Sequence, residues 1–141
     1  IDIRDTAVQF QVLDLFDRWG KGALERGAPQ LELDVEKKSF VRYASYQHPV
    51  PIKSFAIYMH NQIIAFGTNE LANDEYVMAY YRKAERDKQG LFQLLEHETA
   101  KELVKTGHKY LNYQQDLGIL SLRQSKEGYR PVDYVKKYII T

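Results

Sequence analysis

Apolar residues in the first part of the chain recur at the spacing of an amphipathic helix. One face collects residues three or four positions apart: Val8, Val12, Leu15, Phe16 and Trp19. Residues 6–9 have the pattern of a capping box, and Asp5 adds a negative charge where a helix start favours one. The pattern predicts a helix that has Thr6 as its cap and ends near Gly20 or Gly22.

A second helix is predicted after a connection at residues 27–29. It begins near Leu33 or Asp34 and turns a set of apolar side chains inward: Val35, Phe40, Val41 and Ala44. The His-Pro-Val-Pro segment at 48–51 ends this helix, because a residue before proline is pushed out of the helical region.

From residue 54 the apolar period changes from that of a helix to that of a strand. Phe55, Ile57 and Met59 alternate with their neighbours, which predicts a first strand. Residues 63–68 and 76–82 are predicted to form the next two, after turns at 60–62 and 71–74. Three strands joined by short loops form an antiparallel meander.

The second half of the chain predicts a crossover. A helix over 90–106 ends at Gly107 and leads into a strand at 110–113, which we expect to run parallel to strand 76–82. A short helix at 118–127 and a strand at 130–140 close the fold. The expected class is therefore mixed α+β, with one mixed sheet flanked by helices in a single domain over residues 1–141.

Composition narrows the classes of function. The 141 residues include 20 basic and 19 acidic ones, and this balance argues against stable DNA binding and leaves only local nucleic-acid contacts. The absence of cysteine excludes disulfides, thiolate metal sites and a cysteine nucleophile, and it agrees with a cytoplasmic location. No apolar run is long enough for a membrane span. The four histidines lack metal-ligand spacing, so we assign no metal.

The polar stretch from residue 110 to residue 131 indicates where a site lies. A strand end that passes through a polar loop into a helix is where open α/β sheets place ligands. Asn112 and Asp116 are the catalytic candidates, since Asp116 could accept a proton or hold an amine. The alternative for Asp116 is that it caps the following helix.

Two further groups could bind an anion. The turn that contains Lys88, Gln89 and Gly90 precedes the long helix, whose N-terminus favours negative charge. Its alternative is an ordinary helix start in which Gly90 relieves backbone strain, and its single glycine counts against coenzyme A. Arg123 and Lys126 share a face of the short helix and could grip a phosphate, or they could form a solvated face.

The order of elements is that of the GNAT acyltransferase fold, and the local residues are more specific. They resemble the phosphatidylglycerol lysyltransferase C-terminal-like family at Tyr110-Leu111-Asn112, Gln115 to Ile119, Leu122-Arg123, Lys126, Tyr129 and Pro131. Lys83-Ala84 and Gly90 also match, and the resemblance adds Lys83 and Tyr129 to the ligand-binding candidates. It implies a domain of a tandem GNAT-like protein whose characterised members move an aminoacyl group from transfer RNA to a membrane lipid.

The resemblance also implies partners. These are an N-terminal GNAT-like domain, which the start at Ile1 rather than Met also suggests, and a transfer-RNA 3′ end or an anionic lipid. The donor would be aminoacyl-tRNA or acyl-CoA, and membrane association would come through other regions. The family's charged positions are changed at Arg82, Tyr113 and Gln114. The chain is thus interpreted as an acyl-transfer domain, with a non-catalytic binding domain or a plain acyl-CoA N-acetyltransferase as alternatives.

Overall fold

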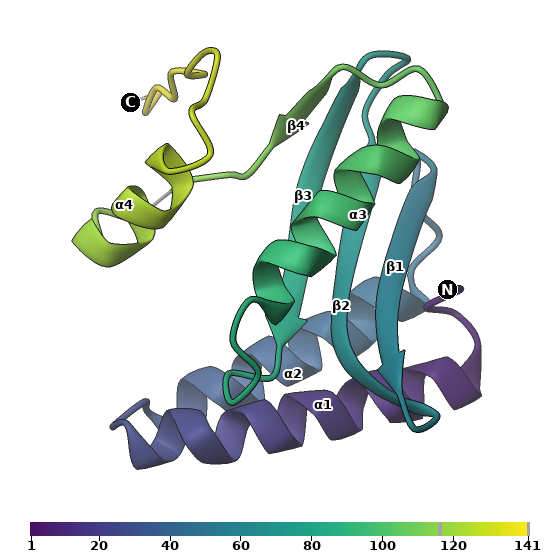
Figure 1. Ribbon diagram of the computed structural model, residues 1–141, viewed down its shortest axis with the longest axis vertical. Helices are drawn as coiled ribbons and strands as arrows, with labels where there is room; N and C mark the ends of the chain where they lie inside the picture. Colours follow the sequence, from purple (N-terminus) through teal and green to yellow (C-terminus); the bar gives the residue numbers. More distant parts are fainter. Residues whose placement is uncertain (116, 141) are drawn as a thin grey trace.

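A four-stranded mixed sheet carries helices on both faces in the computed structural model, which describes residues 1–115 and 117–140 (Figure 1). The elements in chain order are α1 (Thr6–Glu25), α2 (Gln30–Ser45), β1 (Ile52–Met59), β2 (Gln62–Leu71), β3 (Tyr76–Ala84), α3 (Leu91–Lys105), β4 (Tyr110–Asn112) and α4 (Leu120–Glu127). Helices α1 and α2 pack against one face of the sheet and α3 crosses the other (Figure 1).

The sheet confirms the predicted meander and the predicted parallel crossover. Its strand order is β1-β2-β3-β4, and the first three strands form an antiparallel meander. Strand β4 runs parallel to β3, with Tyr76 beside Tyr110 and Met78 beside Asn112. Helix α3 therefore makes the expected crossover between two parallel strands.

The limits predicted for α1 were wrong. Asp5, not Thr6, caps the helix, because its Oδ1 accepts hydrogen bonds from the N–H groups of Ala7 at 2.7 Å and Val8 at 3.2 Å. The helix also continues past both glycines to Glu25. Gly20 is buried against Leu33 of α2, so its small size serves the packing of two helices rather than the end of one.

Two features of α2 and α4 also differ from the prediction. Helix α2 begins at Gln30, directly after Pro29, and leaves Val35 and Val41 exposed while Phe40 and Ala44 are buried. Helix α4 begins at Leu120 rather than at 118.

The strand predicted over residues 130–140 is absent. This segment has no regular structure and leaves the sheet beyond α4, with Ile139 94% and Ile140 97% exposed (Figure 1). Its alternating apolar residues have the composition of a strand, but a strand forms only against a paired edge. In this structure the segment does not reach the short edge strand β4.

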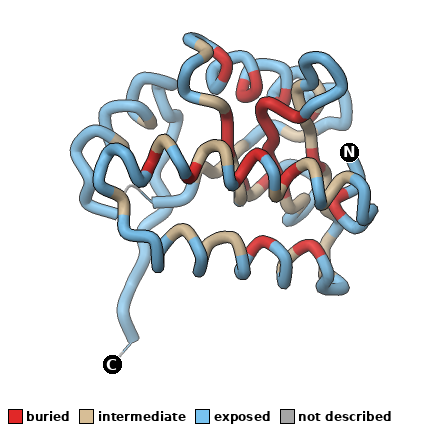
Figure 2. Tube along the Cα trace, turned by 90° about the horizontal axis from the view of Figure 1, so that it is seen from below, coloured by how far each residue is buried: buried red, intermediate tan, exposed pale blue. Residues whose placement is uncertain are grey.

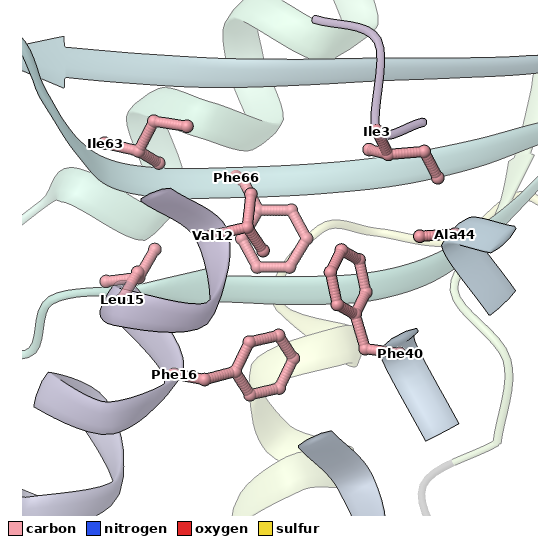
Figure 3. Close-up of a cluster of buried hydrophobic side chains, with 8 residues drawn as sticks. All are labelled: Ile3, Val12, Leu15, Phe16, Phe40, Ala44, Ile63 and Phe66. Carbon is pink, nitrogen blue, oxygen red and sulfur yellow. The ribbon is translucent and has the colours of Figure 1, made fainter. Parts of the chain in front are cut away.

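Aromatic side chains fill the core between the sheet and the first two helices. Phe16, Phe40 and Phe66 pack with ring centroids 5.3–5.8 Å apart (Figure 3). Buried residues lie on both faces of the sheet, against α1 and α2 and against α3. The C-terminal segment is exposed throughout (Figure 2). Burial of each such ring contributes on the order of 1.5–3 kcal/mol, and this core fixes α2 opposite β3.

Candidate functional site

Strand β3 contains a bulge at its centre. Gly67 of β2 pairs with Arg82 and Asn69 pairs with Ala79, so the single residue Thr68 faces two residues, Tyr80 and Tyr81. The Thr68 hydroxyl oxygen accepts a hydrogen bond from the Tyr81 N–H at 3.1 Å. Bulges bend a strand, re-aim its side chains and are frequent beside active sites.

Strand β4 ends beside this bulge, while β3 continues. The Gln114 side-chain amide donates to the carbonyl oxygen of Ala79 at 3.1 Å, and the Gln114 backbone N–H donates to Asn112 Oδ1 at 2.8 Å. Beyond that point the chain leaves the sheet toward α4 (Figure 1). Asn112 thus shapes the turn at which the two parallel strands separate.

A shallow pocket of about 450 Å³, wide open to solvent, lies at this separation, and we call it the edge cavity. It lies between α2 and the free edge of β3 and is lined by Glu36, Ala79, Tyr80, Tyr81, Arg82 and Gln114. A second cavity of about 400 Å³, the interhelix cavity, lies between α1 and α2 and is lined by residues that include Phe16, Trp19 and Leu33. Glu36 lines both cavities.

Arg82, at the wall of the edge cavity, is held by three partners inside the fold. Its Nε lies 2.7 Å from Glu96 Oε1, and its terminal nitrogens donate to Thr68 O at 3.0 Å and Asn69 Oδ1 at 2.5 Å. The side chains of Arg82 and Glu96 are 7% and 1% exposed. The positive charge at this position is therefore neutralised by α3.

Tyr113 belongs to the same buried network. Burial, followed by the charge of Glu96, raises the pKa of the Tyr113 phenol, so the neutral form is favoured. Its ring stacks on Tyr129, with centroids 5.5 Å apart. The stacking of these two rings thus connects the loop after β4 to the residues that follow α4.

Lys83 points to the opposite face of the sheet, under α1 and α2. Its ammonium donates to Glu36 Oε1 at 2.8 Å and lies 3.8 Å from the centre of the Trp19 ring. Burial lowers the pKa of Lys83, and the charge of Glu36 opposes that effect. This predicted ligand-binding lysine is largely enclosed, with its side chain 8% exposed.

The predicted anion turn lies away from Asn112. Asn112 pairs with Met78, whereas Gly90 comes after the end of β3 at Ala84, so six residues of strand, about 20 Å, separate the two. The edge cavity lies along that strand between them. In the turn, Lys88 forms an ion pair with Glu85, Gln89 is exposed, and Gly90 takes a positive φ of 79°.

The α4 candidates have structural contacts. The Lys126 ammonium donates to the carbonyl oxygens of Tyr113 at 2.5 Å and Gln115 at 2.8 Å, which secures the loop after β4. Arg123 lies exposed on α4. Asp116 lies outside the described residues, so its assignment as catalytic residue or cap remains a prediction.

Sequence reasoning missed Glu36 and Glu96. Both are acidic residues at inward positions of helices, Glu36 between Leu33 and Phe40 and Glu96 beside Leu95. A charge on an apolar helix face is the signal that could have identified them.

Within the described ranges, 1–115 and 117–140, no three His, Cys, Asp or Glu residues come together as a metal site. Over the same ranges, none of the helices is both long and apolar enough to cross a membrane.

Solved structures of other proteins have a similar fold. A conserved protein of unknown function from Bacteroides thetaiotaomicron VPI-5482 superposes with a TM-score of 0.72 at 23% identity, over 86% of this chain and 40% of that chain. The aminoglycoside acetyltransferase HMB0005, from an uncultured soil metagenomic sample, gives a TM-score of 0.58 at 10% identity, over 100% of this chain and 94% of that chain. A second aminoglycoside acetyltransferase from such a sample, meta-AAC0020 in complex with sisomicin, gives a TM-score of 0.54 at 12% identity, over 100% of this chain and 92% of that chain.

These likenesses show the fold, which is GNAT-like as expected. The chain spans less than half the length of the Bacteroides protein. No curated protein shows significant sequence similarity to the chain. The family model of the phosphatidylglycerol lysyltransferase C-terminal region matches residues 3–141, nearly the whole sequence, and the chain therefore belongs to that family.

Proposed function

We propose that this chain is the acyl-transfer domain of an aminoacyl- or acyl-transferring enzyme, and that it works as the C-terminal half of a longer protein with tandem GNAT-like domains. The observation that carries the proposal is the edge cavity, which opens where β4 leaves β3 beside a bulge. Ligands of open α/β sheets bind where neighbouring strands separate. Family membership supports an aminoacyl donor, in line with the characterised members.

Acyl transfer requires that donor and acceptor be held together, with a route for the acceptor's proton. The edge cavity is large enough for the reacting ends of both and offers the Glu36 carboxylate and the backbone of the β3 edge. In this proposal Asn112 shapes the turn that admits the acyl group, and Asp116 accepts a proton or holds an amine. Tyr129 and the enclosed Lys83 would then act by supporting the walls of the site.

The donor is proposed to be aminoacyl-tRNA, with acyl-CoA as the simpler alternative. A transfer-RNA 3′ end or an anionic lipid would approach along the outside of the cavity. Its phosphates would meet Arg123 and Lys126 on one side and the turn of Lys88, Gln89 and Gly90 on the other. Such a protein would act in the cytoplasm, with any membrane association supplied by its other regions.

A second candidate function is a binding domain that retains the fold without catalysis. The observation that favours it is the internal neutralisation of the basic groups nearest the cavity, Arg82 by Glu96 and Lys83 by Glu36. Charges that are satisfied inside the fold do not turn toward a substrate without cost.

Transfer assays separate the two functions. Residues 1–141 and the longer protein are incubated with radiolabelled acyl-CoA or aminoacyl-tRNA and with amine or lipid acceptors. We expect product from the longer protein and none from residues 1–141 alone. Binding of a donor to both without product would favour the binding domain. Turnover by residues 1–141 that Asp116→Asn abolishes would refute the need for a second domain and make Asp116 catalytic.

A further inference from the structure

The edge cavity presents acceptors of hydrogen bonds rather than free cations. Its described lining includes two charged residues, Glu36 and Arg82. The Arg82 nitrogens are directed at Thr68, Asn69 and Glu96, away from a ligand. The Glu36 side chain, in contrast, is 38% exposed.

An anion in this cavity would meet unfavourable electrostatics. To reach it, Arg82 would have to leave Glu96, and a carboxylate that is 1% exposed would then be buried without its partner. Such a separation is strongly destabilising. The anion would also face the Glu36 carboxylate directly. The chemistry of the lining therefore selects a cation or a hydrogen-bond donor.

The fold itself shows how Glu36 receives an ammonium. Lys83, under α1 and α2, donates to Glu36 Oε1 at 2.8 Å, and its ammonium lies 3.8 Å from the centre of the Trp19 ring. Tyr80 and Tyr81 line the edge cavity together with Glu36. Aromatic faces and a carboxylate together form a favourable environment for an organic ammonium.

We infer that Glu36 is the amine-recognition residue of the edge cavity, where its carboxylate binds the ammonium group of a primary-amine ligand in competition with the ammonium of Lys83. The inference rests on the proposed function, because it names the chemical class that the transfer site accepts. The amine belongs either to a free acceptor or to an aminoacyl group, in which it stands next to a carbonyl.

Titration with small amines tests this inference without an activity assay. The probes are n-butylamine, the neutral n-butanol, and glycinamide as a mimic of an aminoacyl group, at constant ionic strength near neutral pH. Backbone amide shifts of Tyr80, Tyr81 and Gln114 report the edge cavity. Trp19, the only tryptophan in the sequence, reports the Lys83 side by its fluorescence. We expect both amines to shift these signals and butanol to leave them unchanged. Tighter binding of glycinamide would identify the ammonium as that of an aminoacyl group, and tighter binding of n-butylamine would identify it as that of a free acceptor.

Four variants give the inference its sharpest form. Lys83→Met removes the internal competitor and should tighten amine binding several-fold. Glu36→Gln should weaken it at least about tenfold, the loss expected of one charge-assisted contact. Because Glu36→Gln leaves Lys83 buried without its partner and can unfold the domain, Glu36→Gln with Lys83→Met tests the carboxylate in a neutral background. Glu32→Gln, on the same helix but outside both cavity linings, is the matched control.

Each remaining outcome would overturn the inference. Equal shifts by butanol and butylamine would show that apolar contact, not charge, governs the cavity. Weaker amine binding in Lys83→Met, or unchanged binding in the double variant, would remove Glu36 from recognition. An absence of amine binding alongside transferase activity of the longer protein would defeat this inference and leave the proposed function intact.

Discussion

Arg82 of β3 and Glu96 of α3 form a buried ion pair, with 2.7 Å between Nε and Oε1, that joins the sheet to the crossover helix beside the edge cavity. Pairs of this kind add little net stability as a unit, but loss of one partner is costly because the other charge remains buried. Burial, and after it the charge of Glu96, raises the pKa of Tyr113, while the charge of Arg82 acts in the opposite direction. The ion pair therefore links the wall of the cavity to the loop after β4.

Glu96→Gln should lower the free energy of unfolding by about 3–5 kcal/mol, because it leaves the Arg82 guanidinium without its counter-charge. Urea denaturation followed by circular dichroism measures the change. Glu98→Gln, whose carboxylate lies on the exposed side of α3 near Lys101, is the control and should cost no more than about 1 kcal/mol. Equal effects of the two variants would show that the buried pair has no special role.

Gly67→Ala should destabilise the fold by about 1–3 kcal/mol, the usual range for an overpacked site. A β-carbon at this position would lie 2.7 Å from a terminal nitrogen of Arg82, and that guanidinium cannot move without breaking its contacts with Asn69 and Glu96. Thermal unfolding measures the effect. In Glu96→Gln the guanidinium is less constrained, so the additional cost of the alanine should be smaller there. Strict additivity of the two changes would contradict the proposed packing.

Lys126→Met should loosen the loop after β4 while leaving the sheet unchanged. The lost hydrogen bonds are those from the ammonium to the carbonyls of Tyr113 and Gln115. Hydrogen exchange with mass spectrometry should show faster exchange in residues 113–115 and unchanged exchange in β2. Lys137→Met, in the exposed C-terminal segment, provides a control of equal charge change. If both variants exchange alike, Lys126 does not hold the loop.

The buried charge of Lys83 destabilises the folded state, and this destabilisation should decrease as the pH rises. Burial lowers the pKa of Lys83 in the folded state below its ordinary value of 10.5, so between these two values the unfolded chain binds more protons than the folded one. Across this alkaline window, the free energy of unfolding of the parent protein should therefore increase relative to that of Lys83→Met as the pH rises. The comparison with the variant cancels the buried tyrosines, whose raised pKa values act in the opposite direction. A difference that stays constant with pH would show that Lys83 titrates normally.

Local patterns predicted most of the sheet and the position of the crossover. Period-two alternation and short loops predicted the meander, and the length of the following helix predicted that β3 and β4 run parallel. The bulge at Tyr80 and Tyr81 could not be predicted, because one extra residue leaves the alternating pattern on either side intact.

The site was harder to predict because its contacts join distant positions. Glu36 and Lys83 are 47 residues apart, and their hydrogen bond depends on how α2 packs across β3. Lys83 was predicted from resemblance alone, while its partner carried no motif. The prediction of a strand at 130–140 was wrong for a related reason: the composition of this segment favours a strand, but strand pairing depends on tertiary contacts.

The most direct test of the central claim is where a donor binds. Residues 1–141 labelled with ¹⁵N are titrated with acyl-CoA and, separately, with an aminoacyl-tRNA acceptor-stem analogue, and amide shifts are mapped by two-dimensional NMR. If the edge cavity is the transfer site, the largest shifts will fall on residues 79–82 and on Gln114. Tyr80→Ala, at an exposed position of the lining, will weaken donor binding while the domain stays folded. Shifts confined to the outer faces of α1 or α3, or donor binding unaffected by Tyr80→Ala, would contradict the assignment of the edge cavity as the site.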